Sequence, residues 1–309
     1  MPRNSAVISC LISTLVILTA LTSPSAIAAD AEAAASIVTE SPTMVGRGGR
    51  VWEFDPNDQP YPAYVADPRR PRMNVSIGWT NTDIPETSSG RIMLDAGTRY
   101  TLFKVSNPNS ANEFAIDIEG GLFTQFDLGN QLDSIGWEGV YGIYGVYEWN
   151  NTLDMRFGYK HLSAHLGDEY IETTGRERVG YTRDALIAGF AWRLDNAWTA
   201  YVEPSWAFGM GNEERQERLG IDGGAQYQGP FDLWNGNMAF YGAAHVRAFK
   251  ESNWKPGITG QLGYLIKRDT SSSNLRLVLE AYTGRAILGE FALDYDETYL
   301  TAGFIFDFY

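Results

Sequence analysis

Cysteine and histidine are scarce in this 309-residue chain, with one and three copies respectively. The single cysteine, Cys10, lies in an N-terminal apolar run, so the remainder of the chain has no disulfide to stabilise it. Three histidines without another cysteine argue against a zinc site. The sequence also has no GxGxxG, P-loop, CxxC or HExxH motif, and therefore no signature of nucleotide binding, thiol redox chemistry or zinc proteolysis.

Basic residues and long apolar runs are also few. The chain has 24 lysines and arginines against 38 aspartates and glutamates, a formal net charge of −14, which argues against a nucleic-acid partner. Beyond residue 30, no segment approaches the roughly eighteen consecutive apolar residues that a membrane-spanning helix needs. Helical membrane spans are therefore excluded from the body of the chain.

The N-terminus has the pattern of a secretory signal peptide. Arg3 supplies a positive start, residues 6–21 are apolar, and Ala26-Ile27-Ala28 offers small residues at the positions that signal peptidase reads. We therefore expect residues 1–28 to be a signal peptide that is removed after Ala28. Residues 29–72 are rich first in alanine, then in glycine and proline, which predicts an irregular periplasmic segment or one tucked into the mouth of a barrel.

Aromatic side chains and glycine are abundant, with nine Trp, seventeen Tyr, fifteen Phe and 32 Gly. From residue 73 onward, apolar and polar residues alternate with the period of a β-strand. Ile116 and Ile118, for example, alternate with Asp117 and Glu119. Apolar side chains on one face and charges of both signs on the other favour a closed sheet, whose apolar face meets lipid and whose polar face lines the interior.

The pattern predicts an all-β fold, an antiparallel transmembrane β-barrel of about twelve strands in residues 73–309. Short turns at 150–151 and 195–196 are expected on the periplasmic side, and longer polar loops on the outside. A soluble β-sandwich is the alternative, but it leaves the outward aromatic side chains unexplained. The expected strands are 73–80, 90–105, 113–126, 135–149, 152–165, 181–193, 197–208, 220–228, 237–249, 255–267, 275–285 and 298–309, and the expected long loops are 81–90, 166–180, 209–219 and 286–297.

The last expected strand carries Phe304, Phe306 and Phe308 in alternation. This arrangement resembles the C-terminal signal that the outer-membrane insertion machinery recognises, although Tyr309 follows one residue out of register. The resemblance implies that this machinery is a partner. It also implies that the protein resides in the cell outer membrane, in contact with membrane lipid and lipopolysaccharide.

His161, Ser163 and His165 form the one constellation that suggests chemistry. On the strand expected at 152–165 they share the parity of the lipid-facing apolar residues, near the outer end. Residues two apart on a strand share a face, with Cα atoms about 6–7 Å apart, so His161 is able to take the proton from Ser163. Asp184, on the lipid-facing parity of the next strand, would orient the imidazole if it lies opposite Ser163. His165 is an alternative base.

His161 and Ser163, together with Asp184, resemble the pattern of outer-membrane phospholipase A and lipid A deacylase. In those enzymes a His-x-Ser pair on the outer face of a barrel is completed by Asn or Glu from a neighbouring strand. The resemblance implies a lipid-facing serine esterase at the outer leaflet. Ala164-His165 stands where Asn-Gly often follows such a serine. The residues themselves favour a polar rim that meets headgroups and water, in a barrel with a structural, interaction or narrow-channel role, and the esterase is the alternative.

Three separated motifs carry a second resemblance, which covers most of the chain. They are Tyr64-Val65-Ala66-Asp67-Pro68-Arg69, the segment from Gly121 to Leu128, and the segment from Ser163 to Tyr170. Together they resemble the family catalogued as domain of unknown function 1207. The resemblance implies an envelope barrel and no particular activity.

Acidic residues follow the His-Ser-His cluster in the expected outer loop. Asp168, Glu169 and Glu172 have the oxygen ligands that Ca²⁺ prefers, and would bind a divalent cation or bridge one to lipopolysaccharide phosphates. Such residues more often form a solvated acidic loop, and the cation site is the alternative.

Two further sets of residues fit a barrel wall. His245 and Arg247 have the lumen-facing parity, and we expect them to pair with carboxylates such as Glu203 or Glu280. Aromatic girdles at the two membrane interfaces are expected to include Trp149, Trp192, Trp198 and Trp206.

Overall fold

The computed structural model describes residues 41–46, 49–56, 58–267 and 273–308, so the expected signal peptide and residues 29–40 lie outside the described residues. No helix in these ranges has the length and apolarity needed to cross a membrane. The elements are β1 (Thr43–Val45), β2 (Val51–Phe54), β3 (Met73–Thr82), β4 (Gly90–Asn107), β5 (Ser110–Asp127), β6 (Asp133–Trp149), β7 (Leu153–Leu166), α3 (Asp168–Thr174), β8 (Thr182–Arg193), β9 (Trp198–Met210), β10 (Leu219–Gln228), β11 (Met238–Phe249), η3 (Lys250–Ser252), β12 (Gly257–Lys267), β13 (Ser273–Arg285), α4 (Gly289–Ala292) and β14 (Asp296–Phe308).

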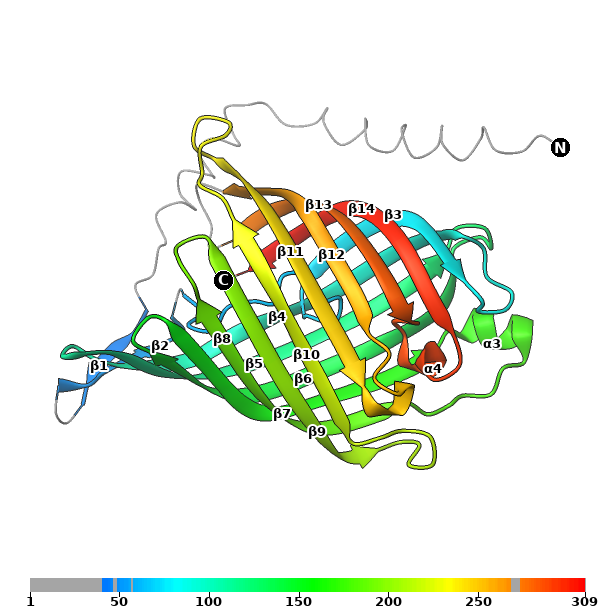
Figure 1. The fold of residues 1–309 in the computed structure, drawn as a ribbon, viewed down its shortest axis with the longest axis horizontal. Coiled ribbons are helices and arrows are strands. Elements are labelled where there is room, and N and C mark those ends of the chain that lie inside the picture. The colour runs from blue at the N-terminus through cyan, green and yellow to red at the C-terminus, as the bar shows by residue number, and fades with distance from the viewer. Residues whose placement is uncertain (1–40, 47–48, 57, 268–272, 309) are drawn as a thin grey trace. The chain divides into compact units, whose positions relative to one another are not determined.

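Strands β3 to β14 close into an antiparallel barrel of twelve strands (Figure 1). Each strand pairs with its neighbours in the chain, and β14 closes the ring by pairing with β3, for example Phe306 with Met73. The fold expected from the sequence is confirmed, and each expected span matches an observed strand to within a few residues. A closed barrel also removes the soluble β-sandwich from consideration.

The hairpin of β1 and β2 extends the sheet beyond the barrel. β2 pairs with the distal part of β4, with Val51 opposite Ser106. The segment from residue 29 to residue 72, which we expected to be irregular, thus contains two short strands in its described part.

The barrel wall has an apolar outer face and a polar inner face. On β12, Gln261 is 1% exposed whereas its neighbour Leu262 is 56% exposed. Phe157 on β7 points outward and Glu138 on β6 points inward, with exposed fractions of 61% and 0%. This is the arrangement that a barrel in lipid requires. The tryptophans expected in girdles are all 41–50% exposed on the outer face and lie near strand ends: Trp149, Trp192, Trp198 and Trp206.

One end of the barrel carries the longer loops, including α3 and α4 (Figure 1). Ile84, Tyr170 and Phe291 come from three different loops and join one buried cluster. Glu290 on α4 is fully buried and accepts a hydrogen bond from the backbone N–H of Val179 at 2.7 Å. Long loops of outer-membrane barrels lie outside the cell, so this is the outer end.

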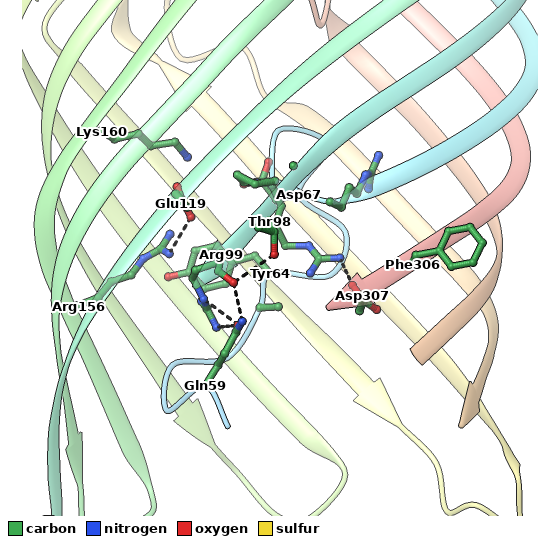
Figure 2. A pocket seen from close by; sticks show the side chains of 15 residues that line it. Gln59, Tyr64, Asp67, Thr98, Arg99, Glu119, Arg156, Lys160, Phe306 and Asp307 are labelled. Carbon is green, nitrogen blue, oxygen red and sulfur yellow. Dashed lines mark hydrogen bonds and ion pairs between the residues drawn. The ribbon is translucent and has the colours of Figure 1, made fainter. Parts of the chain in front are cut away.

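Residues 58–72, here called the plug segment, run through the interior of the barrel (Figure 2). Arg69 pairs with Glu138 on β6, with Nε 2.7 Å from Oε2, and Arg72 pairs with Asp95 on β4 at 2.8 Å. All four side chains are buried. Removing one partner of a buried ion pair costs about 3–5 kcal/mol, so these contacts hold the segment in the lumen.

Aromatic contacts also hold the same segment against β7 and β9. Tyr64 stacks on Tyr201 of β9, with ring centroids 3.8 Å apart and planes at 5°. The guanidinium of Arg156 on β7 lies 4.7 Å from the centroid of the Tyr64 ring. Such cation–π contacts strengthen when they are shielded from water, as they are here.

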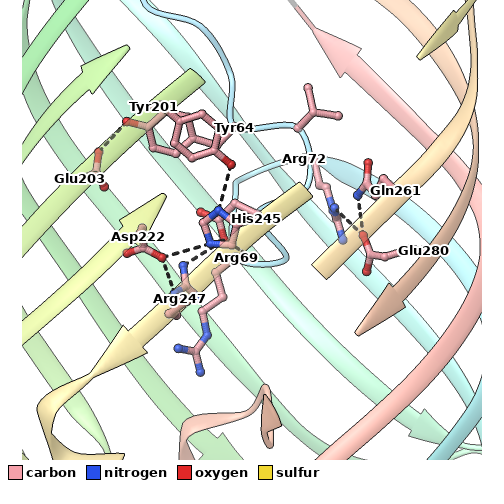
Figure 3. A network of polar contacts seen from close by, with 12 residues as sticks. Tyr64, Arg69, Arg72, Tyr201, Glu203, Asp222, His245, Arg247, Gln261 and Glu280 are labelled. Carbon is pink, nitrogen blue, oxygen red and sulfur yellow. Dashed lines mark hydrogen bonds and ion pairs between the residues drawn. The ribbon is translucent and has the colours of Figure 1, made fainter. Parts of the chain in front are cut away.

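His245 and Arg247 face the lumen, as the alternation of β11 predicts, but their partners differ from those expected (Figure 3). Arg247 lies opposite Asp222 in the β10–β11 register, and its Nε is 2.7 Å from Asp222 Oδ1. Nε2 of His245 is 3.1 Å from the same oxygen. Arg247 also reaches Asp67 of the plug segment at 2.9 Å.

The expected pairing with Glu203 or Glu280 was wrong because other cations hold these carboxylates. Arg156 lies 2.6 Å from Glu203, and Arg72 of the plug segment lies 3.3 Å from Glu280. Strand parity predicts which side chains face the lumen. It does not predict where a segment that enters the lumen brings its own charges.

Two spaces of very different size lie beside the plug segment. A cavity of about 30 Å³ lies beside Tyr64, Asp67 and Arg99. A vestibule of about 1010 Å³ opens between the plug segment and the short turns at 150–151 and 195–196. The described lumen is thus filled between its two ends, which argues against a wide pore.

Candidate active site

His161, Ser163 and His165 lie on the outer face of β7, as the alternation predicts. All three are partly exposed, whereas Leu162 and Ala164 between them are buried at 7% and 0% exposure. The three polar side chains therefore interrupt a lipid-facing surface close to the outer end of the strand.

Asp184 lies directly opposite His161 across the β7–β8 pair, and Thr182 lies opposite Ser163. This register differs by two residues from the expected pairing of Ser163 with Asp184. As a result, Asp184 Oδ1 lies 2.8 Å from Nδ1 of His161. The hydroxyl of Tyr159 donates a second hydrogen bond to the same oxygen. Two donors on one carboxylate oxygen hold the acid and the imidazole in a fixed orientation.

Ser163 forms its hydrogen bond with His165, not with His161. Its Oγ is 3.1 Å from Nε2 of His165, and Nη2 of Arg178 is 2.7 Å from Nδ1 of the same ring. A guanidinium only donates hydrogen bonds, so Nδ1 of His165 accepts and the ring proton resides on Nε2. His165 then donates to Ser163 and has no lone pair with which to take a proton from it.

His161 has the opposite tautomer. Its Nδ1 faces a carboxylate and therefore carries the proton, which leaves Nε2 as the acceptor. The hydroxyl proton of Ser163 has no acceptor among the described residues when His165 donates to Oγ. For His161 to act as the base, the Ser163 hydroxyl has to leave its bond with His165 and turn toward Nε2 of His161.

Aromatic side chains of β6 hold both imidazoles. Trp137 lies opposite His165 and stacks on it, with ring centroids 4.0 Å apart. Tyr141 lies opposite His161 and stacks at 4.6 Å. The sequence prediction missed these two residues, as well as Tyr159 and Arg178. The β6–β7 register counted from the turn at 150–151 would have revealed the first two, because cross-strand pairs are the contacts of a sheet.

The acidic residues proposed for a cation do not converge. Asp168 and Glu169 occupy the first turn of α3 and are both exposed. In the described ranges, no group of three or more His, Cys, Asp or Glu side chains is placed to hold a metal ion. The candidate active site consists of Ser163, the two histidines, and the side chains that contact the imidazoles. These residues, here called the outer-wall cluster, are Ser163, His161, Asp184, Tyr159, Tyr141, His165, Arg178 and Trp137.

The chain matches the model of a family described as protein of unknown function (DUF1207) over residues 24–308. It belongs to the DUF1207 family. No curated protein matches the chain. Among solved structures, the DUF1207 barrel is similar to outer-membrane phospholipase A from Escherichia coli, with 12% identity and a TM-score of 0.52, covering 77% of this chain and 94% of that one. It is also similar to the calcium-bound dimer of the outer-membrane phospholipase of Salmonella typhi, with 12% identity and a TM-score of 0.52, covering 81% and 94%.

These comparisons confirm the expected family and the expected fold. At 12% identity the likeness to the phospholipases concerns the fold alone. A closed barrel with a lipid-facing wall, similar to barrels of the outer membrane, locates the DUF1207 protein in the cell outer membrane.

Proposed function

We propose that the DUF1207 barrel is a serine hydrolase that cleaves acyl esters of lipids in the outer leaflet. In this proposal Ser163 is the nucleophile, His161 the general base and Asp184 the group that orients the base. The observation that carries it is the 2.8 Å contact between Asp184 and Nδ1 of His161, on the lipid-facing wall and two residues from a serine. This contact leaves Nε2 of His161 free to accept a proton.

The reaction follows from this arrangement. Ser163 Oγ attacks the ester carbonyl carbon while its proton passes to Nε2 of His161. The tetrahedral intermediate collapses, and the C–O bond to the alcohol breaks as His161 returns the proton to the leaving oxygen. Water then attacks the acyl-serine, again with His161 as base. The products are a fatty acid, an alcohol and the free serine.

His165 and Arg178 have a different part in the proposal. Their hydrogen bonds make Nε2 of His165 a donor beside Ser163, with a guanidinium behind it. Donors aimed at the carbonyl oxygen stabilise the charge that develops there, and one such donor contributes about a hundredfold to a thousandfold in rate. The N–H groups of the paired strands are engaged in the sheet, so a side-chain donor has added value here.

Two further features support access from lipid. The lumen is filled by the plug segment, so a substrate reaches the outer-wall cluster from the membrane and not through the barrel. Two solved barrels with a similar fold are named as outer-membrane phospholipases.

The second candidate is a barrel with a structural or interaction role. It is favoured by the bond between Ser163 and His165, because a donor histidine and an exposed arginine also describe a polar rim that meets headgroups. Under this reading the protein hydrolyses nothing, and the plug segment keeps it closed.

The test is acyl-ester hydrolysis by the detergent-refolded protein, with and without Ca²⁺. We expect Ser163→Ala to abolish activity and Thr182→Val to retain it. Thr182 lies opposite Ser163 on the same face, so its substitution controls for the loss of one hydroxyl at this height. Heat-modifiable gel migration establishes that each variant is folded. Equal activity of the wild type and Ser163→Ala would contradict the proposal, and the absence of hydrolysis in folded wild type would favour the structural barrel.

A further inference from the structure

We infer that Arg178 anchors the phosphate of a lipid, so that the outer-wall cluster acts on phosphate-bearing acyl lipids and not on neutral glycerides. The inference rests on the proposed function and adds the substrate class. The first observation is that only the imidazole of His165 separates Arg178, a permanent cation, from the nucleophile Ser163. Nη2 of Arg178 is 2.7 Å from Nδ1 of His165, whose Nε2 is 3.1 Å from Ser163 Oγ.

The backbone that carries Arg178 is held in place. The N–H groups of Val179 and Gly180 donate to the buried carboxylate of Glu290 at 2.7 Å and 3.0 Å. Glu290 belongs to α4, and this helix packs into the buried cluster under the outer loops. The backbone next to Arg178 is thus anchored, and its guanidinium lies beside His165.

The charge of Arg178 is only partly compensated. Its Nε is 3.9 Å from Glu290, a carboxylate already occupied by backbone donors, and its other neighbour is a histidine ring. Within the described residues, Nη1 of Arg178 has no hydrogen-bond acceptor. The side chain is 49% exposed at the outer end of the wall. Arg176 and Arg215 of the neighbouring loops differ, because both form close ion pairs with Asp294.

These properties match the phosphate of an acyl lipid. In a phospholipid, or in the acylated sugar of lipid A, the phosphate lies a few bonds from an ester. A guanidinium binds phosphate through two parallel N–H bonds, and such charge-assisted bonds are stronger than neutral ones. A neutral diacylglycerol offers no group for this contact. Binding the phosphate at Arg178 would bring the ester to Ser163, at the depth where headgroups meet acyl chains.

A binding experiment tests the anchor without relying on hydrolysis. In a Ser163→Ala background, binding of phosphatidylglycerol, lipid A and diacylglycerol is measured by native mass spectrometry of the detergent-solubilised barrel. We expect Arg178→Gln to weaken binding of a phosphate-bearing lipid about tenfold and to leave diacylglycerol binding unchanged. Arg178→Lys keeps the charge without the planar fork, and an intermediate loss is expected. Arg215→Gln, an exposed loop arginine with the same charge change, should bind like the parent.

The two phosphate-bearing lipids distinguish the source of the phosphate. The lipid whose binding weakens in the Arg178→Gln variant belongs to the substrate class that the anchor recognises. Equal binding of both lipids by the Arg178→Gln variant and its parent, in folded protein, would overturn the anchor.

Measurements of kcat and KM separate this inference from the proposed function. With Ser163 restored, Arg178→Gln also removes the donor that fixes the tautomer of His165, so we expect kcat to fall by a similar factor on both substrates, whereas KM should rise about tenfold for the phosphate-bearing lipid alone. A loss of kcat without this selective rise in KM would overturn the anchor and assign Arg178 to the chemistry alone, leaving the hydrolase intact. Arg178-dependent binding in a wild type that hydrolyses no ester would instead support the anchor and refute the hydrolase.

Discussion

Asp184 and His161 face each other across the β7–β8 pair, with a carboxylate oxygen 2.8 Å from Nδ1 of the imidazole. The contact lies on the outer wall of the barrel, where a carboxylate needs partners because water is scarce. It has two of them, His161 and Tyr159. An acid that orients an imidazole beside a serine is the arrangement that activates a serine nucleophile. On a lipid-facing wall, the substrate within reach of that nucleophile is a membrane lipid.

The first prediction separates the two histidines. We expect His161→Phe to lower kcat by about 10⁴, because this removes the base, and His165→Phe to lower it by about a hundredfold, because this removes a donor. Both values come from initial rates on one ester, with Thr182→Val as the control. The reverse order of losses would assign the base to His165.

The second prediction concerns the closed lumen. The wild-type protein should give little conductance in planar lipid bilayers, and a variant that lacks residues 41–70 should open a pore, because Tyr64, Asp67 and Arg69 no longer fill it. Deletion of residues 41–54 alone removes only the β1–β2 hairpin and should leave the barrel closed. Wild-type conductance equal to that of the longer deletion would show that the plug segment does not block the lumen.

The third prediction tests how firmly the plug segment is bound. Arg69 and Glu138 are both buried, and the carboxylate of Glu138 also accepts the backbone N–H of Gly289. We expect Glu138→Gln to destabilise the barrel by about 3–5 kcal/mol because it leaves the arginine buried without its partner. The double variant Arg69→Met/Glu138→Gln should lose less than the sum of the single losses. Urea-induced unfolding in detergent measures both, and additive losses would show that the pair is not coupled.

The fourth prediction uses the acid that links three outer loops. Partial burial raises the pKa of Asp294, but hydrogen bonds from Arg176 and Arg215 outweigh it and hold the pKa below the usual 3.8. A lowered pKa stabilises the folded form above the unfolded value, and this contribution is lost as the pH falls through the folded value. Relative to their intrinsic exchange rate at each pH, the amide hydrogens of residues 286–295 should therefore be more protected near neutral pH than well below pH 3.8.

A matched variant checks the cause of this acid sensitivity. Asp294→Asn should show the weaker protection at neutral pH, since it removes the charge without changing the shape of the side chain. Unchanged exchange of residues 286–295 in this variant would mean that the ion pairs with Arg176 and Arg215 do not hold the outer loops together.

Much of the barrel could be predicted from the sequence because a lipid-facing wall has a strict alternation. The short turn at Asn150 and Asn151, both with positive φ, also fixes the β6–β7 register, so Trp137 opposite His165 could have been found by counting. The β7–β8 register could not, because a loop of residues 167–181 separates the strands. The pairing of Asp184 was therefore misplaced by two residues.

The contacts between side chains in the lumen could not be predicted from the sequence for a related reason. Asp67 and Arg247 meet across most of the chain length, through a segment that has no strand periodicity. Arg178 likewise lies in a long loop, and only the folded loop brings it to His165. The period and parity of a strand determine whether a side chain faces the lipid or the lumen. The long loops and the plug segment determine which charged side chains meet.

The most direct test of the central claim is covalent labelling with a lipid-like fluorophosphonate, which reacts with activated serines, followed by peptide mass spectrometry of the folded barrel. The account predicts modification at Ser163 in the wild type and in Thr182→Val, and a large loss of labelling in His161→Phe. Folded wild-type protein that remains unlabelled at Ser163, or that is labelled equally without His161, would contradict the assignment of Ser163 and His161 as nucleophile and base.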